Sequence, residues 1–188
     1  GRTARNQATG DAITFASPST LSGPVALASN GGDITLAAMA GGAQDLTLNA
    51  GAGALSLASL SNGGNVDFAG AGNASIGSLA AQSATVNVGG SYGFNGTVTI
   101  ANALTLNVLD SGTFADSVTA GSLAMNAVDS TVTFDGASSV TGVLAIADGE
   151  QVTFNASLAA GSLTAAATAT GLAFNDTVNV SGASTLSN

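Results

Sequence analysis

The chain has 188 residues, of which 45% are apolar and only 7% are charged, and 11 acidic side chains against two basic ones give a net charge of −9. This apolar content excludes a disordered chain, and the near absence of Lys and Arg excludes a basic surface for nucleic acid. The sequence contains no Cys and no His, which excludes disulfides, thiol chemistry and imidazole catalysis. No apolar run approaches the roughly 20 residues of a membrane helix, so we expect no membrane insertion.

The first ten residues carry both basic side chains, Arg2 and Arg5, and contain no alternating apolar pattern. We predict that residues 1–10 form an N-terminal extension or a strap onto a neighbour, and that residues 11–188 form a single domain. Pro18 and Pro24 fall in a predicted loop, where the missing amide donor of proline is tolerated.

Short apolar–small–apolar triplets begin at Ile13 and recur along the chain. Such short alternation is typical of strands with one buried face, and the Gly, Asn, Asp and Ser residues between the triplets are turn formers. Dense Gly together with β-branched Thr and Val argues against helix. The first triplets span residues 13–15, 25–27, 34–36, 46–48 and 55–57.

The triplets recur about every 20 residues, which is typical of a repeat protein whose coils stack on one another. We therefore predict an all-β fold, a parallel β-solenoid with about 20 residues per coil and eight or nine coils. One predicted column of buried side chains, with steps close to this repeat length, contains Ile13, Ile34, Leu55, Ile76, Val98, Val118, Val140, Leu158 and Val178. A second column, with similar steps, contains Val25, Leu46, Val66, Val86, Leu104, Leu123, Leu144 and Leu163.

We predict that the cross-section of the coils changes near residues 89–94. Before this point, the Ala/Gly segments 50–54 and 69–72 take the place of a third side, where the backbones of adjacent coils can approach closely. A separate column in this half contains Met39, Leu60 and Leu79. After this point, a regular 20-residue spacing predicts one buried aromatic stack, formed by Phe94, Phe114, Phe134, Phe154 and Phe174.

Several of these Phe residues are followed by an Asn-x-Ser/Thr turn, for which two interpretations stay open. In the structural one, which we favour, Asn ends the strand and its side chain hydrogen-bonds between coils. In the functional one, Asn carries an N-linked glycan, although a chain so rich in Ser and Thr contains chance acceptor sites. The acceptor pattern is present at Asn73, Asn95, Asn155, Asn175 and Asn179.

We predict no catalytic residue, no cofactor and no bound metal. Asp33, Asp45 and Asp67 lie beside strands at unequal spacings, which do not define one site. Residues 63–67, Gly-Gly-Asn-Val-Asp, are only distantly similar to calcium-binding nonapeptide repeats. A carbohydrate-binding or carbohydrate-cleaving β-helix is the alternative function. It would require exposed aromatic platforms or paired carboxylates, and Tyr92 is the candidate platform.

Three segments carry a family resemblance: Gly-Gly-Asp-Ile-Thr-Leu at 31–36, Asp-Leu-Thr-Leu-Asn-Ala-Gly at 45–51 and Gly-Ser-Leu-Thr at 161–164. They resemble the shaft repeats of filamentous-haemagglutinin-like adhesins, which are bacterial exoproteins often exported by two-partner secretion. The resemblance implies a right-handed parallel β-helix, a location outside the cell or on its surface, and a role in adhesion, aggregation or matrix formation. No functional residue is carried over, because no receptor-binding insertion of the family is identifiable in the sequence.

We therefore expect a non-catalytic structural segment of an extracellular bacterial fibre or adhesin shaft. The unpaired edges of the outermost coils, at 13–27 and 172–186, are expected to continue into further repeats or to associate head-to-tail with another copy. A carbohydrate or a host surface is the expected ligand class.

Overall fold

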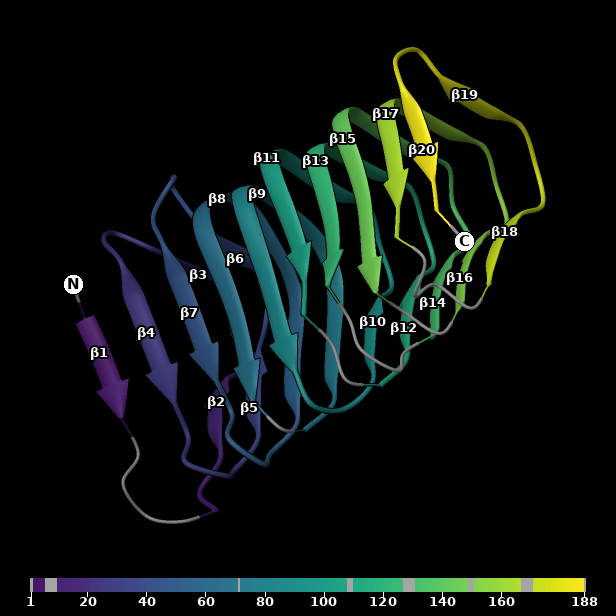
Figure 1. Ribbon diagram of the computed structural model, residues 1–188. Coiled ribbons are helices and arrows are strands. Elements are labelled where there is room, and N and C mark those ends of the chain that lie inside the picture. The colour runs from purple at the N-terminus through teal and green to yellow at the C-terminus, as the bar shows by residue number, and fades with distance from the viewer. Residues whose placement is uncertain are drawn as a thin grey trace.

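The computed structural model describes residues 2–5, 10–70, 72–107, 110–126, 131–148, 151–166 and 171–187. These residues form strands and turns without helix, and the strands pair in parallel. The coils stack along one axis, from β1 at one end to β18, β19 and β20 at the other (Figure 1). The fold is a parallel β-solenoid of about eight turns, roughly 20 residues apart, as the repeat predicts.

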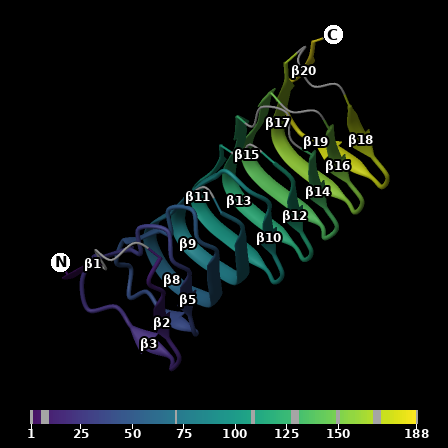
Figure 2. The ribbon, with the colours of Figure 1, turned by 90° about the horizontal axis from the view of Figure 1, so that it is seen from below.

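Each coil passes in turn through three strand-bearing sides, which we name faces A, B and C. Face A contains β2 (Ile13–Phe15), β5 (Ile34–Leu36), the first parts of β8 (Leu55–Gly70) and β9 (Ala74–Val88), β10 (Tyr92–Phe94), β12 (Gly112–Phe114), β14 (Thr131–Phe134), β16 (Gln151–Phe154) and β18 (Leu172–Phe174). Figure 2 shows the short strands β10, β12, β14 and β16 following one another along the axis.

Face B contains β3 (Ser19–Thr20), β6 (Met39–Ala40), the middle of β8 and β9, the first parts of β11 (Val98–Leu106), β13 (Val118–Asn126), β15 (Ser138–Asp148) and β17 (Leu158–Ala165), and β19 (Val178–Val180). Face C contains β1 (Arg2–Arg5), β4 (Val25–Ala28), β7 (Leu46–Asn49), the last parts of β8, β9, β11, β13, β15 and β17, and β20 (Ser184–Leu186).

The alternation of apolar and small residues places every second side chain in the interior. In β7, for example, Leu46 and Leu48 are buried, whereas Thr47 and Asn49 face solvent. Because each strand bonds to the equivalent strand of the next coil, buried side chains stack in columns along the axis. The core is therefore a set of parallel apolar columns enclosed by three faces.

The predicted aromatic stack is confirmed on face A. Neighbouring rings from Phe94 to Phe154 are nearly parallel, with centroids 4.6 to 4.8 Å apart, and these four side chains are at most 1% exposed. Phe174 continues the stack at 5.5 Å but is only partly buried, because it lies in the last described coil. The column also extends towards the N-terminus through three aliphatic residues, Ile76, Leu57 and Leu36, and ends at Phe15, which the 20-residue spacing did not include.

The two long columns predicted from the sequence need correction. The first one changes face: Ile76 pairs with Phe94 on face A, whereas Val98 pairs with Leu79 on face B. It slips again after Val118, which pairs with Ser138 and not with Val140. In the second column Val66 pairs with Ala84, not with Val86. Faces A and B repeat the same short pattern with the same period, so spacing alone does not distinguish their strands.

The third side is also placed differently from the prediction. The segment 50–54 lies at the corner between faces C and A, and the separate column of Met39, Leu60 and Leu79 belongs to face B, where it continues through Val98 and Val118. Strand pairing passes through residues 89–94 without interruption, since Tyr92 pairs with Ala74 on one side and with Gly112 on the other. All three faces are thus present on both sides of this point.

Glycines at the corner between faces C and A allow the close approach that the sequence predicts. A Cβ atom on Gly53 would overlap the carbonyl of Gly32 in the preceding coil, and one on Gly72 would overlap the carbonyl of Gly53. A similar column at the other end of face C contains Gly142, Gly161 and Gly182. Only glycine fits at such positions, because adjacent backbones leave no room for a side chain.

The N-terminal segment differs from expectation in one respect. Residues Arg2–Arg5, which lack an alternating pattern, form β1 and pair in parallel with β4 on face C. Backbone hydrogen bonding to the neighbouring coil requires no apolar side chain, so sequence pattern does not reveal this strand. Pro18 and Pro24 lie between strands, as predicted.

Replacing Phe134 by Ala should lower the free energy of unfolding by about 3–5 kcal/mol, because it removes a fully buried ring stacked between two others. Phe174→Ala is the matched control and should cost less, since Phe174 is stacked on one side only. Urea titrations followed by circular dichroism would measure both. Equal costs for the two variants would contradict the proposed role of the stack.

Candidate functional site

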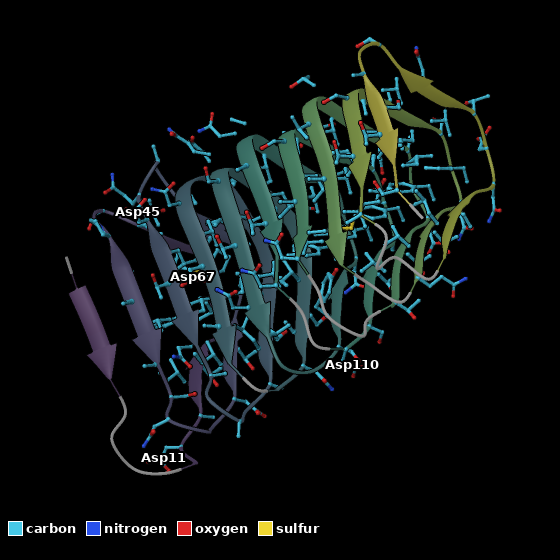
Figure 3. The ribbon with its side chains drawn as sticks, in the orientation of Figure 1. Asp11, Asp45, Asp67 and Asp110 are labelled. Carbon is cyan, nitrogen blue, oxygen red and sulfur yellow. The ribbon has the colours of Figure 1, made fainter. Side chains whose placement is uncertain are left out.

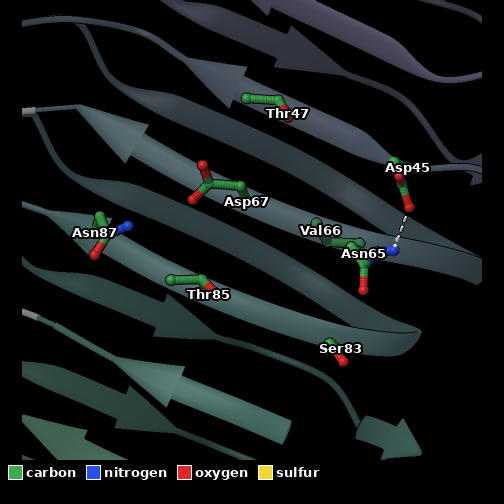
Figure 4. Close-up of a pocket in the computed structure, with 8 residues that line it drawn as sticks. All are labelled: Asp45, Thr47, Asn65, Val66, Asp67, Ser83, Thr85 and Asn87. Atoms are coloured by element: carbon green, nitrogen blue, oxygen red, sulfur yellow. Dashed lines mark hydrogen bonds between the residues drawn. The ribbon is translucent and has the colours of Figure 1, made fainter. Parts of the chain in front are cut away.

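A shallow depression of about 400 Å³ lies on the outer surface of face C, in the N-terminal half of the solenoid. Figure 3 shows Asp45 and Asp67 on neighbouring coils of this half. Three adjacent coils line the depression, and their side chains are drawn in Figure 4: Asp45 and Thr47, then Asn65, Val66 and Asp67, then Ser83, Thr85 and Asn87.

The strand period creates this polar surface. Thr47, Asp67 and Thr85 occupy the same register position on β7, β8 and β9, so their side chains form one outward column. Their neighbours along each strand, such as Val66 and Phe68, point into the core. Towards the C-terminus the column continues with Thr105, Ala124, Ala145, Thr164 and Thr185. Asp67 is thus a carboxylate within a column of hydroxyl and methyl side chains.

Asp67 is poorly solvated and poorly paired. Its side chain is partly buried, and its Oδ1 atom is buried without a hydrogen-bond partner. Burial raises the pKa of the Asp67 carboxyl above its usual value, and a hydrogen bond with the Asn87 side chain opposes this effect. The whole chain contains only two basic residues, Arg2 and Arg5, at its N-terminal end. The carboxylate is therefore held on the sheet at a cost in stability.

The other two acids singled out from the sequence have structural roles. Asp45 Oδ1 accepts a hydrogen bond from the backbone N–H of Asn65, 2.8 Å away in the next coil (Figure 4). Asp33 accepts one from the N–H of Ala54 in the same manner, also at 2.8 Å, and lies outside the depression.

The sequence predicts no common site for these three acids, and Asp33 does lie apart from the other two. Asp45 and Asp67, however, line one depression, which the prediction missed. Their separation in the sequence is one coil plus one repeat of the side-chain alternation along a strand. This spacing could have predicted that Asp45 and Asp67 lie on the same surface.

Among the described residues, no three His, Cys, Asp or Glu side chains gather where they could hold a metal ion. The segment 63–67, distantly similar to calcium-binding repeats, contributes Asn65 and Asp67 to the depression together with Asp45. Two carboxylates, one of them engaged in a backbone hydrogen bond, make a poor calcium cage, because Ca²⁺ takes six to eight oxygen ligands in proteins.

The five glycosylation candidates are all exposed, and three of them donate side-chain hydrogen bonds to a side chain of the preceding coil. Asn175 Nδ2 donates to Asn155 Oδ1, and Asn155 Nδ2 donates to Asp135 Oδ1, both at 2.7 Å. Asn95 Nδ2 donates to Ser75 Oγ at 3.1 Å. These ladders agree with the structural interpretation of the Phe-Asn turns. A second ladder, which the sequence did not suggest, joins Asn87, Asn107 and Asn126 at the end of face C.

The other two candidates differ from these three. Asn73 uses its side-chain oxygen, which accepts a hydrogen bond from the N–H of Ser91 at 3.0 Å. Asn179 lies on face B, in a second shallow depression of about 290 Å³ that also contains Ser139, Thr141 and Ser181. Glycosylation of these residues stays a prediction from the sequence.

Tyr92 is not the exposed aromatic platform that the sequence suggested. Its side chain is 3% exposed and makes edge-on contacts with Phe94 and Phe114, at centroid distances of 6.1 and 5.9 Å. The ring fills the space above Gly112, where a Cβ atom would overlap it. Its hydroxyl is buried without a hydrogen-bond partner, and this burial raises the pKa of the phenol. The sequence did not reveal that Gly112, in the next coil, leaves space in the core for the ring of Tyr92.

Comparisons of the chain with protein-family models, with curated proteins and with solved structures find no match. In the part of the chain that the structure describes, no helix is long and apolar enough to cross a membrane. The geometry of the depression around Asp67 is therefore the main guide to a site.

Tyr92→Phe should raise the free energy of unfolding by about 1–3 kcal/mol, because it removes a buried hydroxyl that has no partner while keeping the ring. Tyr92→Leu is the control and should lower stability, since it loses the edge-on contacts with Phe94 and Phe114. Chemical denaturation would measure both variants. A less stable Tyr92→Phe variant would show that the hydroxyl has a partner.

Asp67→Asn should raise the melting temperature at pH 7, because it removes a poorly solvated charge and keeps the shape of the side chain. The pKa of the Asp67 carboxyl is higher in the folded state than its ordinary value of 3.8. The free energy of unfolding of the wild type therefore falls as pH rises from 3.8 through the pKa of the folded state. The advantage of the variant should therefore disappear below pH 3.8. Thermal melts across this range would test it, and an advantage that persists in acid would contradict the assignment to Asp67.

Proposed function

We propose that this chain is a non-catalytic structural segment of an extracellular bacterial fibre or adhesin shaft. The observation that carries the proposal is the unbroken stacking of coils, with continuous buried columns on all three faces. A stack of this kind extends along one axis and can grow by adding coils without altering the existing ones. It provides length and stiffness, which are the properties that a shaft requires.

Contacts between coils support this role. Strands bond to their neighbours above and below, and side-chain ladders add further hydrogen bonds on the outside, as between Asn155 and Asn175. Few charges interrupt the surface, since only 7% of residues are charged. The absence of Cys means that the stack needs no disulfide, so its stability does not depend on the redox state of its surroundings.

The outermost coils offer surfaces for further coils. At the C-terminal end Val178 is 42% and Leu186 is 61% exposed, and at the N-terminal end Phe15 is 40% exposed. Phe15 and Phe174 are the two ends of the same face A column, so a coil stacked at either end would extend that column. We propose that these edges take another parallel coil, either from a continuing chain or from a second copy joined head-to-tail.

The N-terminal end has a distinct outline. Strand β1 extends face C by one strand beyond β2 and β3, the first strands of faces A and B. A coil that stacks there must therefore supply strands for faces A and B before it meets β1. A continuing chain can match this step, whereas a second copy ends with β18, β19 and β20 on the three faces, so either β1 or β20 must leave face C in a head-to-tail join.

Carbohydrate binding is the second candidate function. The depression around Asp67 favours it, since a carboxylate surrounded by hydroxyl and amide side chains suits hydroxyl-rich ligands. The ligand of a shaft would then be a polysaccharide of a matrix or of a host surface.

The purified 188-residue chain should form end-to-end rods whose length increases with protein concentration, as measured by light scattering and electron microscopy. Val178→Asp should shorten the rods, because it places a charge on the exposed end of the stack. Val143→Asp is the matched control: Val143 is 46% exposed, but it lies on the side of face C, away from both ends, and its replacement should leave rod length unchanged.

Circular dichroism of both variants would establish that the solenoid is intact. A monomer at every concentration would contradict self-association. Covalent continuation would then be tested by whether the gene encodes further repeats on either side of these 188 residues. Immunogold labelling of the source cells would test the extracellular location, and labelling confined to the cytoplasm would contradict the proposed function.

A further inference from the structure

Among the described residues of face C, Asp67 is a charged side chain that the fold does not require. At the same register position the neighbouring coils carry Thr47 and Thr85, which form the same strands without a charge. The Asp67 carboxylate has one buried oxygen without a partner. A side chain that opposes the stability of its own fold and opens into a depression is a candidate for binding.

We propose, as a more specific form of the carbohydrate-binding function proposed above and resting on it, that the depression around Asp67 binds the hydroxyl groups of a neutral saccharide. An ionised carboxylate only accepts hydrogen bonds, and because Oδ1 of Asp67 is buried, a sugar hydroxyl donates to the other oxygen, Oδ2. The hydroxyls of Thr47, Thr85 and Ser83 and the amide of Asn65 both donate and accept, so they match the remaining sugar hydroxyls. The proposed ligand therefore satisfies every kind of polar group that lines the site.

Other classes of ligand fit less well. An anionic ligand would meet the Asp67 carboxylate in a chain with a net charge of −9. An apolar ligand would find no exposed apolar side chain, because Val66, the apolar residue of the lining, is 2% exposed. A divalent cation would have Asp67 and few further carboxylates, since Asp45 Oδ1 is engaged by the N–H of Asn65.

The form of the site also indicates the form of the ligand. The depression is shallow and extends over three coils of a regular sheet, so it touches one side of a ligand and does not enclose it (Figure 4). A segment of a polysaccharide chain lying on the face fits this shape better than a monosaccharide. Single sites should bind weakly, and several copies displayed along a fibre would bind a polymer more tightly.

Nuclear magnetic resonance titration of the whole chain would test the proposal, with Val178→Asp introduced in every sample so that rod formation does not broaden the signals. The probes are neutral oligosaccharides of glucose, mannose and galactose, an oligogalacturonate as the acidic counterpart, and calcium chloride alone. A neutral oligosaccharide should shift the amide signals of Thr47, Asp67 and Thr85 at pH 7. Asp67→Asn should weaken this binding by at least about tenfold, because a hydrogen-bonded carboxylate is lost.

The matched control is Thr164→Val, which changes the same outward column several coils away and should leave binding unchanged. Binding to the wild type should also weaken in acid, as Asp67 becomes protonated, whereas binding to the Asp67→Asn variant should not. The proposal is overturned if no neutral oligosaccharide shifts these signals, if Asp67→Asn binds as well as the wild type, or if calcium alone produces the shifts. None of these outcomes depends on filament formation, so the site and the shaft role are tested separately.

Discussion

The structure depends on one constraint, the hydrogen bonding of each strand to the same strand of the neighbouring coil. Parallel pairing at a fixed spacing of ~4.8 Å brings each residue beside its counterpart one turn away. Each residue therefore lies between the equivalent residues of the two adjacent coils, and a favourable contact between equivalent residues is repeated along the axis. The Phe stack on face A and the Asn ladder through Asn155 and Asn175 are products of this constraint, one inside the wall and one outside it.

The same constraint makes the coils sensitive to bulk at their corners. Where Gly53 and Gly72 succeed Gly32, adjacent backbones approach so closely that a methyl group would overlap a carbonyl. Tyr92 shows how a large side chain is accommodated within a column: the next coil has Gly112 at the equivalent position, and the ring occupies the vacated space. Packing in this fold thus depends more on contacts between residues one turn apart than on contacts between neighbours in the sequence.

Asp67 stands apart because it gains little from the stack, a single hydrogen bond with the Asn87 side chain of the next coil. A hydroxyl at its position would fit the column of Thr47 and Thr85, and the carboxylate is partly desolvated with little compensation. The two proposals made for this protein follow from the two kinds of surface that result. The regular stack and its open ends support a role as a shaft, and the one costly departure from regularity on face C supports a site for a ligand.

The sequence by itself determined the class of fold, because a 20-residue repeat of apolar–small–apolar triplets with Gly-rich turns suits a parallel solenoid and little else. It also predicted the aromatic stack, because the 20-residue spacing is maintained over five successive Phe residues, Phe94, Phe114, Phe134, Phe154 and Phe174. The sequence did not determine which strands share a face. Faces A and B have the same local pattern, and the step from Ile76 to Val98 looked regular although it changes face. The register is set by backbone pairing over whole coils. The spacing between single residues therefore does not by itself determine which strands pair.

For the same reason only the tertiary structure decided the site. Asp45 and Asp67 line one depression because their separation along the chain is one coil and one further side-chain repeat of a strand. Tyr92, the apparent surface aromatic, is buried because Gly112 lies beside it in the next coil. In both cases the chemistry of a residue depends on a neighbour one turn away. That neighbour is identified by hydrogen-bond register, which corners of variable length shift from coil to coil.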